Sequence, residues 1–169
     1  GPKIGPNLSG PYLGSKELRE QGVRVKIMGE RSRFSEEVLQ MIHYIEETTA
    51  DAERLTLVLA FNYSSRREIT LGVQDIARRV ANGTLKAEDI NEQTIAESLM
   101  TAQMPDPDMI IRTSGECRLS NFLLWQSSYA EFYFPETLWP DFTEEEFDKA
   151  IEVFSKRDRR YGLVTETKE

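Results

Sequence analysis

A dense group of polar residues between positions 106 and 131 carries the chemistry that this sequence offers. Arg112 ends an apolar stretch, where a charge is costly unless paired, and Arg118 and Ser120 follow in the next turn. Two guanidinium groups, a hydroxyl and exposed helix amides suit a diphosphate, because arginine grips phosphate oxygens with two parallel hydrogen bonds. Nearby carboxylates are suited to Mg²⁺, which takes one or two carboxylates plus substrate phosphates. The whole group is Asp106, Asp108, Arg112, Thr113, Ser114, Glu116, Arg118, Ser120, Asn121 and Glu131.

The same residues have plainer interpretations. Arg112 could pair with Asp108 or Glu116 simply to satisfy a buried loop, since structural ion pairs also fill such places. Ser120 could cap a helix, and by composition alone an aromatic run favours a hydrophobic core over a binding surface. That run consists of Phe122, Trp125, Tyr129, Phe132, Tyr133 and Phe134.

Composition limits the class of protein. The 169 residues fit one domain, and 21 Lys+Arg against 29 Asp+Glu give a net charge of -8, which argues against a nucleic-acid partner. The single Cys117 excludes an internal disulfide framework and a cysteine-built zinc site, and reads as an inert thiol. His43, the one histidine, argues against a Ser-His-Asp triad. With no apolar run of membrane-spanning length, we expect a cytoplasmic protein.

The elements that must position the polar group follow from the hydrophobic pattern. We predict strands at residues 23–28, 55–61 and 109–113. We predict a helix that ends near 21, one after the Ser35 cap, one through 69–80, one over 90–102, and one after the Thr143 cap, where Glu146 would complete a capping box. The stretch 55–61 is nearly all apolar, which predicts a strand buried on both faces.

Strands that alternate with helices predict an α/β fold with a largely parallel central sheet flanked by helices. In such sheets ligands bind beyond the carboxyl ends of the strands. The polar residues that follow the carboxyl ends of the three predicted strands are 29–31, 62–66 and 112–116.

Several blocks of the sequence resemble one enzyme family. DPDMIIRTSGECRLSNFLLWQSSYAEFYFPETLWPDF (106–142) closely resembles the signature of the cis-prenyltransferases, whose bacterial archetype is undecaprenyl diphosphate synthase. Further blocks stand in the family's order: GVRVKIMGERSRF (22–34), LTLVLAFNYSSRREI (55–69) and KRDRRYG (156–162). The resemblance covers residues 15–162, which we take as the C-terminal part of a single cis-prenyltransferase domain. Residues 1–14 read as a linker whose Gly1-Pro2 looks like a tag remnant, and 163–169 as a tail.

The resemblance implies a reaction and a set of binding residues. The family condenses isopentenyl diphosphate onto an allylic diphosphate, often farnesyl diphosphate, and Mg²⁺ assists departure of the allylic diphosphate. By motif, Arg112, Arg118 and Ser120 would bind the diphosphate of isopentenyl diphosphate. The resemblance also implies that Glu131 would help to hold Mg²⁺, in this family at the site of the neighbouring subunit. Supporting roles would fall to Asn62, Arg66, Asp108 and Glu116.

The resemblance also implies a homodimer. Arg160-Tyr161-Gly162 matches the family's terminal Arg-X-Gly motif, in which Arg160 and Gly162 would reach the partner's diphosphate. The run 122–134 would then form much of the interface, in place of a core. Because the family's product is a long lipid, peripheral contact with a membrane is a further expectation.

Some features depart from the family pattern. Ser64-Ser65 stands where Gly-Gly is common, and Cys117 where Gln or His is common. Residues 1–14 do not resemble the family's Asp-Gly-Asn-Gly-Arg-Trp block, which supplies the catalytic aspartate, so no catalytic residue is assigned and the fold is expected to be incomplete at its N-terminus. We therefore expect this chain to carry the isopentenyl-diphosphate half of the site and to be inactive alone. The alternatives are a non-catalytic scaffold subunit of a heteromeric cis-prenyltransferase and a generic anion-binding α/β domain.

Overall fold

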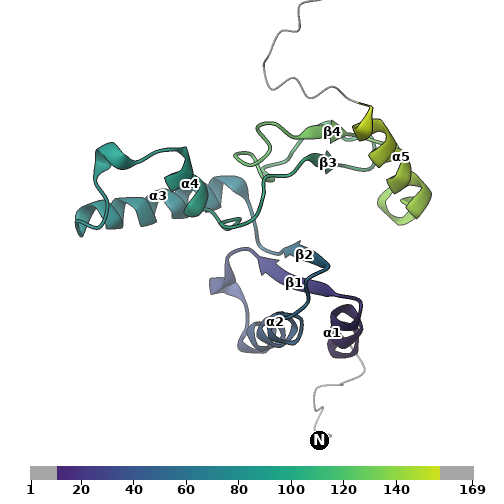
Figure 1. Cartoon of the computed structure of the whole chain (residues 1–169), viewed down its shortest axis with the longest axis horizontal. Helices are drawn as coiled ribbons and strands as arrows, with labels where there is room; N and C mark the ends of the chain where they lie inside the picture. The colour runs from purple at the N-terminus through teal and green to yellow at the C-terminus, as the bar shows by residue number, and fades with distance from the viewer. Residues whose placement is uncertain (1–10, 157–169) are drawn as a thin grey trace, which may run out of the picture. The chain divides into compact units, whose positions relative to one another are not determined.

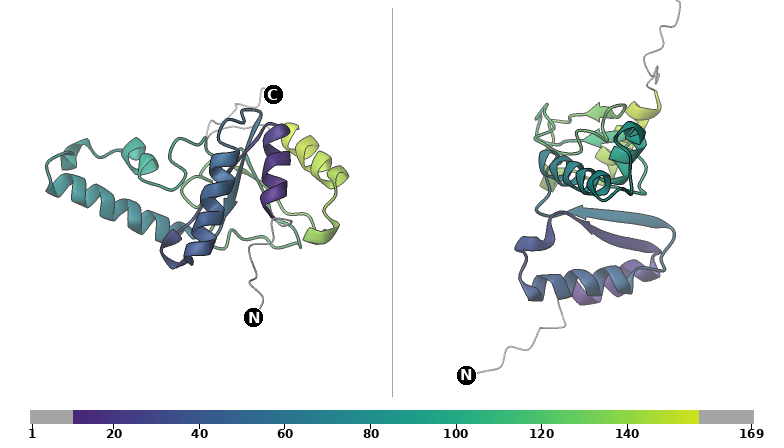
Figure 2. Two further views of the ribbon diagram at one scale, coloured as in Figure 1. Left: turned by 90° about the horizontal axis from the view of Figure 1, so that it is seen from below. Right: turned by 90° about the vertical axis from the view of Figure 1, so that its left-hand side faces the viewer.

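The structure is a computed structural model that describes residues 11–156 (Figure 1). The chain divides into two compact units, Gly1–Ala102 and Gln103–Glu169, and each is described by itself. Figure 2 shows two further views of the same ribbon.

The first unit begins with a small parallel sheet. Strand β1 (Val23–Met28) pairs in parallel with β2 (Leu55–Ala60), with Val23 opposite Leu55 and Met28 opposite Ala60. Helices α1 (Pro11–Glu20) and α2 (Glu36–Thr48) pack on β1, with the short 3₁₀ turn η1 (Arg31–Arg33) before α2. The core of this layer consists of Val25, Ile27 and Ile42. These strands and the Ser35 cap of α2, whose Oγ accepts from the Val38 N–H at 3.4 Å, confirm the predicted elements.

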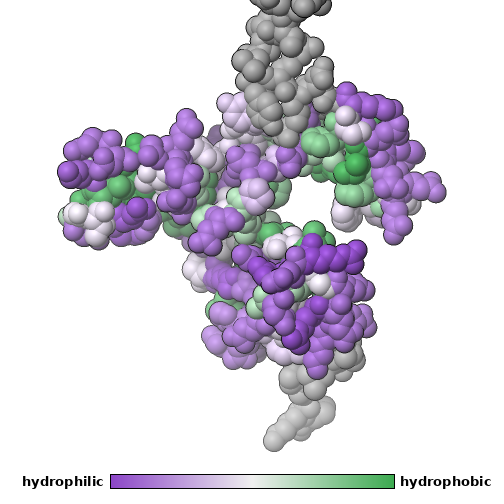
Figure 3. Space-filling model, viewed as in Figure 1, coloured by the Kyte–Doolittle hydropathy of each residue, from purple (hydrophilic) through white to green (hydrophobic). Residues whose placement is uncertain are grey.

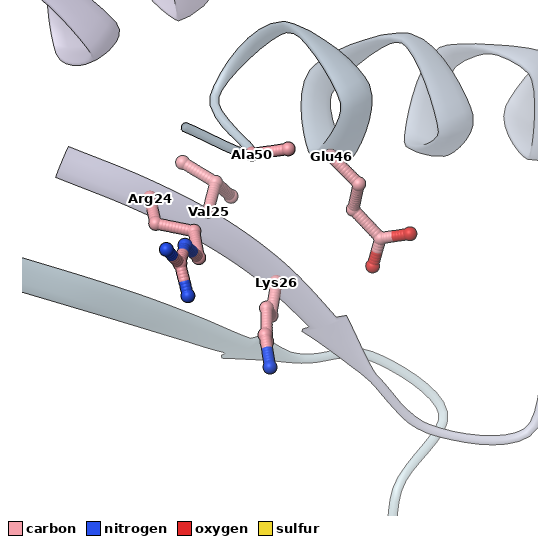
Figure 4. A pocket seen from close by; sticks show the side chains of 5 residues that line it. All are labelled: Arg24, Val25, Lys26, Glu46 and Ala50. Carbon is pink, nitrogen blue, oxygen red and sulfur yellow. The ribbon is translucent and has the colours of Figure 1, made fainter. Parts of the chain in front are cut away.

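Side chains of α2 and of its C-cap residue Thr49 bond the outer edge of β1. The Val25 N–H donates to Thr49 Oγ1 and the Ile27 N–H to Glu46 Oε1, both at 2.9 Å. Glu46 also accepts from Arg31 at 2.7 Å, so its carboxylate is occupied. A shallow cavity of about 370 Å³ lies beside this edge, and Figure 4 shows Arg24 and Lys26 pointing away from the helix that carries Glu46. An edge satisfied in this way cannot add a further strand.

Strand β2 corrects one prediction. We expected it to be buried on both faces, but Leu55, Leu57 and Leu59 are 57%, 38% and 37% exposed, and Phe61 is 53% exposed. Figure 3 shows apolar surface over this strand. The physical reason is that α1 and α2 cover β1, and within the described residues β2 pairs with β1 alone.

The first unit ends with two helices. Helix α3 (Ser65–Ala81) and helix α4 (Glu92–Glu97) pack on one another, with the 3₁₀ turn η2 (Ala87–Asp89) between them. The buried residues of α3 are Ser65, Glu68, Gly72 and Ile76, whereas Val73 on the same helix is 56% exposed. Helix α4 is shorter than the predicted 90–102.

The second unit holds another parallel pair. Strand β3 (Met109–Ile111) pairs with β4 (Glu131–Tyr133), and the 3₁₀ turn η3 (Trp139–Asp141) and helix α5 (Glu144–Ser155) follow. The Thr143 cap is confirmed, since its hydroxyl accepts from the Glu146 N–H at 3.4 Å. The Glu146 carboxylate, however, bonds Lys149 and Thr137 rather than closing the capping box.

Parallel pairs flanked by helices confirm the predicted α/β class. The expected single sheet is seen, within the described residues, as two separate two-stranded sheets. The proposed domain limits remain a prediction. None of the helices between residues 11 and 156 is both long and apolar enough to cross a membrane.

Candidate functional site

Arg112 is the centre of the polar group in the second unit. It follows β3 directly, and its backbone N–H donates to the Tyr133 carbonyl at 3.0 Å, which extends the ladder to β4. Its Nη1 donates to the Arg118 carbonyl at 2.6 Å and to Ser120 Oγ at 2.8 Å. The structure therefore brings together the three residues that sequence analysis assigned to diphosphate binding. Neither Asp108 nor Glu116 is the partner of this guanidinium.

Arg118 projects from the loop that Arg112 holds. Its guanidinium forms an ion pair with Glu116, a residue to which sequence analysis assigned a supporting role. The side chains are 63% and 39% exposed, and exposed pairs of this kind contribute about 0–1 kcal/mol. Because this ion pair contributes so little free energy, an incoming anion can replace Glu116 as the partner of the Arg118 guanidinium.

The backbone of this loop is unusual. Ser114, Ser120, Asn121 and Leu123 all have positive φ, between 47° and 70°, a region that costs non-glycine residues free energy. The loop is tied down at its base, where the Ser114 N–H donates to the Thr137 carbonyl at 2.8 Å. Such strain often occurs at functional sites, and here it surrounds the Arg112 hydrogen bonds.

Glu131 and Asp108 meet at the amino ends of the parallel strands β4 and β3, away from Arg112, which follows the carboxyl end of β3. Glu131 begins β4, and its N–H donates to the Asp108 carbonyl at 2.9 Å. Within residues 11–156 no three Asp, Glu, His or Cys side chains gather as a metal cluster. Mg²⁺ commonly takes one or two carboxylates and completes its shell with phosphate oxygens, so a single Glu131 carboxylate fits such an ion when a diphosphate is also bound.

The aromatic run does not form the buried core that composition favoured. Phe122 is 38% and Tyr129 66% exposed and the other four aromatic residues are half-buried, whereas the buried residues of this segment are Gln126 and Ser127. Phe132 and Phe134 stack with ring centroids 5.8 Å apart. Exposed aromatic rings on one segment are typical of a surface that another partner covers.

The first unit carries a separate polar cavity at the carboxyl ends of β1 and β2. It measures about 450 Å³, and its lining residues are Glu30, Arg33, Asn62, Tyr63, Ser64 and Arg67. Asn62, an assigned supporting residue, donates from Nδ2 to the Glu30 carbonyl at 2.8 Å, and the Glu30 N–H donates back to the Asn62 carbonyl at 3.1 Å. Arg66, the other, is exposed on the first turn of α3 and does not line the cavity.

Glu30 and Arg67 form the main charged pair of this cavity. Arg67 donates from Nε and Nη2 to the two carboxylate oxygens of Glu30, at 2.9 and 2.7 Å. These bonds hold the pKa of Glu30 at about 2, below its usual 4.5, and raise the pKa of Arg67. Both groups therefore stay charged at neutral pH.

Sequence reasoning missed Glu30, Arg67 and Glu68. All three lie in blocks that were recognised, and Glu30 is one of the polar residues that follow the predicted strands, but none of them was given a role. Glu68 is buried on the same face of α3 as Gly72, and the i, i+4 spacing of the two is the signal that was available. Arg160 and Gly162, assigned to the Arg-X-Gly ending, lie outside the described residues.

Comparisons with known proteins agree on the kind of protein this is. The family model described as "Putative undecaprenyl diphosphate synthase" matches residues 9–162. The chain is 50% identical over 145 residues to an isoprenyl transferase of Thermotoga maritima, covering 86% of this chain and 61% of the relative. It is 46% identical over 151 residues to the ditrans,polycis-undecaprenyl-diphosphate synthase ((2E,6E)-farnesyl-diphosphate specific) of Vibrio vulnificus, covering 89% and 60%.

The fold of this chain is also similar to a solved structure. The crystal structure of lavandulyl diphosphate synthase from Lavandula x intermedia, in complex with dimethylallyl diphosphate, matches with a TM-score of 0.84 and 37% identity, over 88% of this chain and 64% of that one. The chain thus spans about three fifths of the length of the curated relatives that it matches.

Proposed function

We propose a function that follows from the family of this chain, which belongs to the undecaprenyl diphosphate synthase family of prenyltransferases. The chain would carry the isopentenyl-diphosphate half of a cis-prenyl elongation site. The reaction would condense isopentenyl diphosphate onto an allylic diphosphate, farnesyl diphosphate being the expected one. The observation that supports this half-site is the Arg112 guanidinium, which is docked on Ser120 and Arg118 at the carboxyl end of β3.

The arginines would bind the diphosphate in complementary ways. Nη1 of Arg112 is already engaged, so its orientation is fixed and the remaining N–H groups of the guanidinium are presented as a rigid fork. Arg118 would leave the exposed Glu116 and close on the phosphate from the other side. Together they would neutralise and orient isopentenyl diphosphate for condensation.

Glu131 would hold the metal. Mg²⁺, when bound, supplies positive charge that helps the allylic diphosphate to depart. The carboxylate can serve because phosphate oxygens complete the octahedral shell that this ion demands.

The other assignments belong to the same proposal. Asn62 and Arg66 would have supporting roles within the first unit, and Arg160 and Gly162 would act across a homodimer. The exposed aromatic residues Phe122 and Tyr129 are consistent with such an interface.

A chimera tests the proposal. The matched residues of this chain would replace their counterparts in the Thermotoga maritima isoprenyl transferase, and product would be measured by mass spectrometry with farnesyl diphosphate, isopentenyl diphosphate and Mg²⁺. We expect elongated prenyl diphosphates, none with EDTA, and none from the Arg112→Ala chimera. The Arg78→Ala chimera, altered at an exposed arginine of α3, should match the unaltered chimera. A folded chimera without product, beside an active parent enzyme, would contradict the proposal.

A further inference from the structure

Glu68 is an unusual residue because its charged side chain lies inside the protein. It is 1% exposed, although carboxylates are seldom buried unless well paired. The Tyr63 hydroxyl donates to Glu68 Oε1, and the Met100 N–H donates to Oε2 at 3.0 Å. Each carboxylate oxygen therefore holds a different segment of the first unit.

One of those segments is a wall of the polar cavity. Tyr63 and Ser64 line the cavity, and Ser65, which follows them, is fully buried. The turn starts at Asn62, whose φ of +50° is held by its paired hydrogen bonds with Glu30. The wall is thus fixed at one end by Glu30 and at the other by Glu68.

The cavity itself is suited to an anion. Its lining includes two arginines, Arg33 and Arg67, against one carboxylate, Glu30, which leaves a net positive charge. Arg33 is exposed, whereas Arg67 is bound to Glu30. The carboxyl ends of parallel strands, where this cavity lies, are the ordinary place for a ligand in such folds.

We propose that Glu68 is a positioning residue for anion binding at this cavity. Its carboxylate ties Tyr63 to Met100 and so fixes the 62–65 turn against which a diphosphate-class anion would rest. This inference rests on the proposed function, because it assigns the cavity to the same substrate class. Enzyme reactions lose up to about 100-fold in rate when positioned groups move by about 1 Å, so a buried residue that fixes a binding wall can have a large effect.

Residue-resolved NMR on the isotope-labelled chain tests this, with inorganic diphosphate as the probe. The amide shifts of residues 62–65 report a Kd for the cavity, and those of Arg118 and Ser120 report a separate Kd for the second unit. In Glu68→Gln the amide group can accept only one of the two donors. We expect its cavity Kd to rise about 10- to 100-fold, with the Kd at Arg118 and Ser120 unchanged.

Matched variants separate positioning from stability. Glu88→Gln removes the same charge from an exposed site and should leave both Kd values as in wild type. Tyr63→Phe removes one donor, keeps the carboxylate and should raise the cavity Kd about 3- to 10-fold. A merely structural role would lower the melting temperature without changing the cavity Kd well below it.

The outcomes distinguish the two proposals. Equal cavity Kd values in wild type and Glu68→Gln, or turn amides that do not respond to diphosphate, would overturn the role of Glu68. If Arg118 and Ser120 amides do not respond while the turn amides do, the proposed function fails and Glu68 keeps its role at an anion site.

Discussion

Replacing Ser120 by alanine removes one of the two acceptors that orient Arg112. The bond from Arg112 Nη1 to Ser120 Oγ is 2.8 Å long, and the Arg118 carbonyl remains as the other acceptor. Hydrogen bonds to charged groups contribute about 1.5–3 kcal/mol, and because Ser120 is exposed and water can replace its hydroxyl, we expect about 1–1.5 kcal/mol. That corresponds to binding of isopentenyl diphosphate weakened about 5- to 12-fold. The backbone strain at φ +49° hardly changes, since both residues carry a Cβ.

Isothermal titration with isopentenyl diphosphate is the assay for Ser120→Ala. Ser155→Ala is the matched control, because Ser155 is an exposed serine of the same unit whose hydroxyl donates to the Glu152 carbonyl, in a helix outside the loop that holds Arg112 and outside the run 122–134. Ser155→Ala should bind as wild type does. If Ser120→Ala binds within twofold of wild type, Ser120 does not orient Arg112 for the ligand and the reasoning fails.

Three further predictions concern the first unit. Gly29→Ala would place a Cβ 1.6 Å from the Phe61 carbonyl oxygen at a backbone φ of +139°. Urea unfolding should therefore show that the free energy of unfolding falls by more than about 3 kcal/mol. A fall of less than about 1 kcal/mol would contradict this geometry. Arg67 lowers the pKa of Glu30 from 4.5 to about 2, so the pair stabilises the fold above pH 4.5 and this contribution is lost as the pH falls towards 2. The stability difference between wild type and Glu30→Gln should shrink over that range, and a constant difference would refute the pairing. Ser35→Ala should cost about 0.5–1 kcal/mol by loss of the α2 cap, and unchanged thermal unfolding would contradict it.

Local patterns predicted the elements well because local physics forms them. Strand β1 and the helix caps at Ser35 and Thr143 occur where alternation and capping chemistry place them. The grouping of Arg112 with Ser120 could also be predicted, because both flank one tight turn after a strand.

What depends on distant packing could not be predicted. The apolar run of β2 indicates a buried strand, but burial requires covering elements, and among the described residues of the first unit Leu55 and Leu57 stay exposed. The buried charge of Glu68 depends on Met100, which lies 32 residues away in the sequence. The cavity at Asn62, by contrast, lies at two strand ends that the sequence marked as of interest, residues 29–31 and 62–66, and only the placement of Arg33 and Arg67 in its lining depends on packing.

Titration of isopentenyl diphosphate into the wild-type chain and Arg118→Ala tests the central claim most directly. Loss of a charge-assisted contact, offset by the weak pair with Glu116, predicts a Kd raised about 5- to 100-fold. Arg118→Lys keeps the charge, and its Kd for isopentenyl diphosphate should lie between those of wild type and Arg118→Ala. The Kd of Arg78→Ala should equal that of wild type. An Arg118→Ala chain that binds isopentenyl diphosphate as tightly as wild type would contradict the diphosphate cradle.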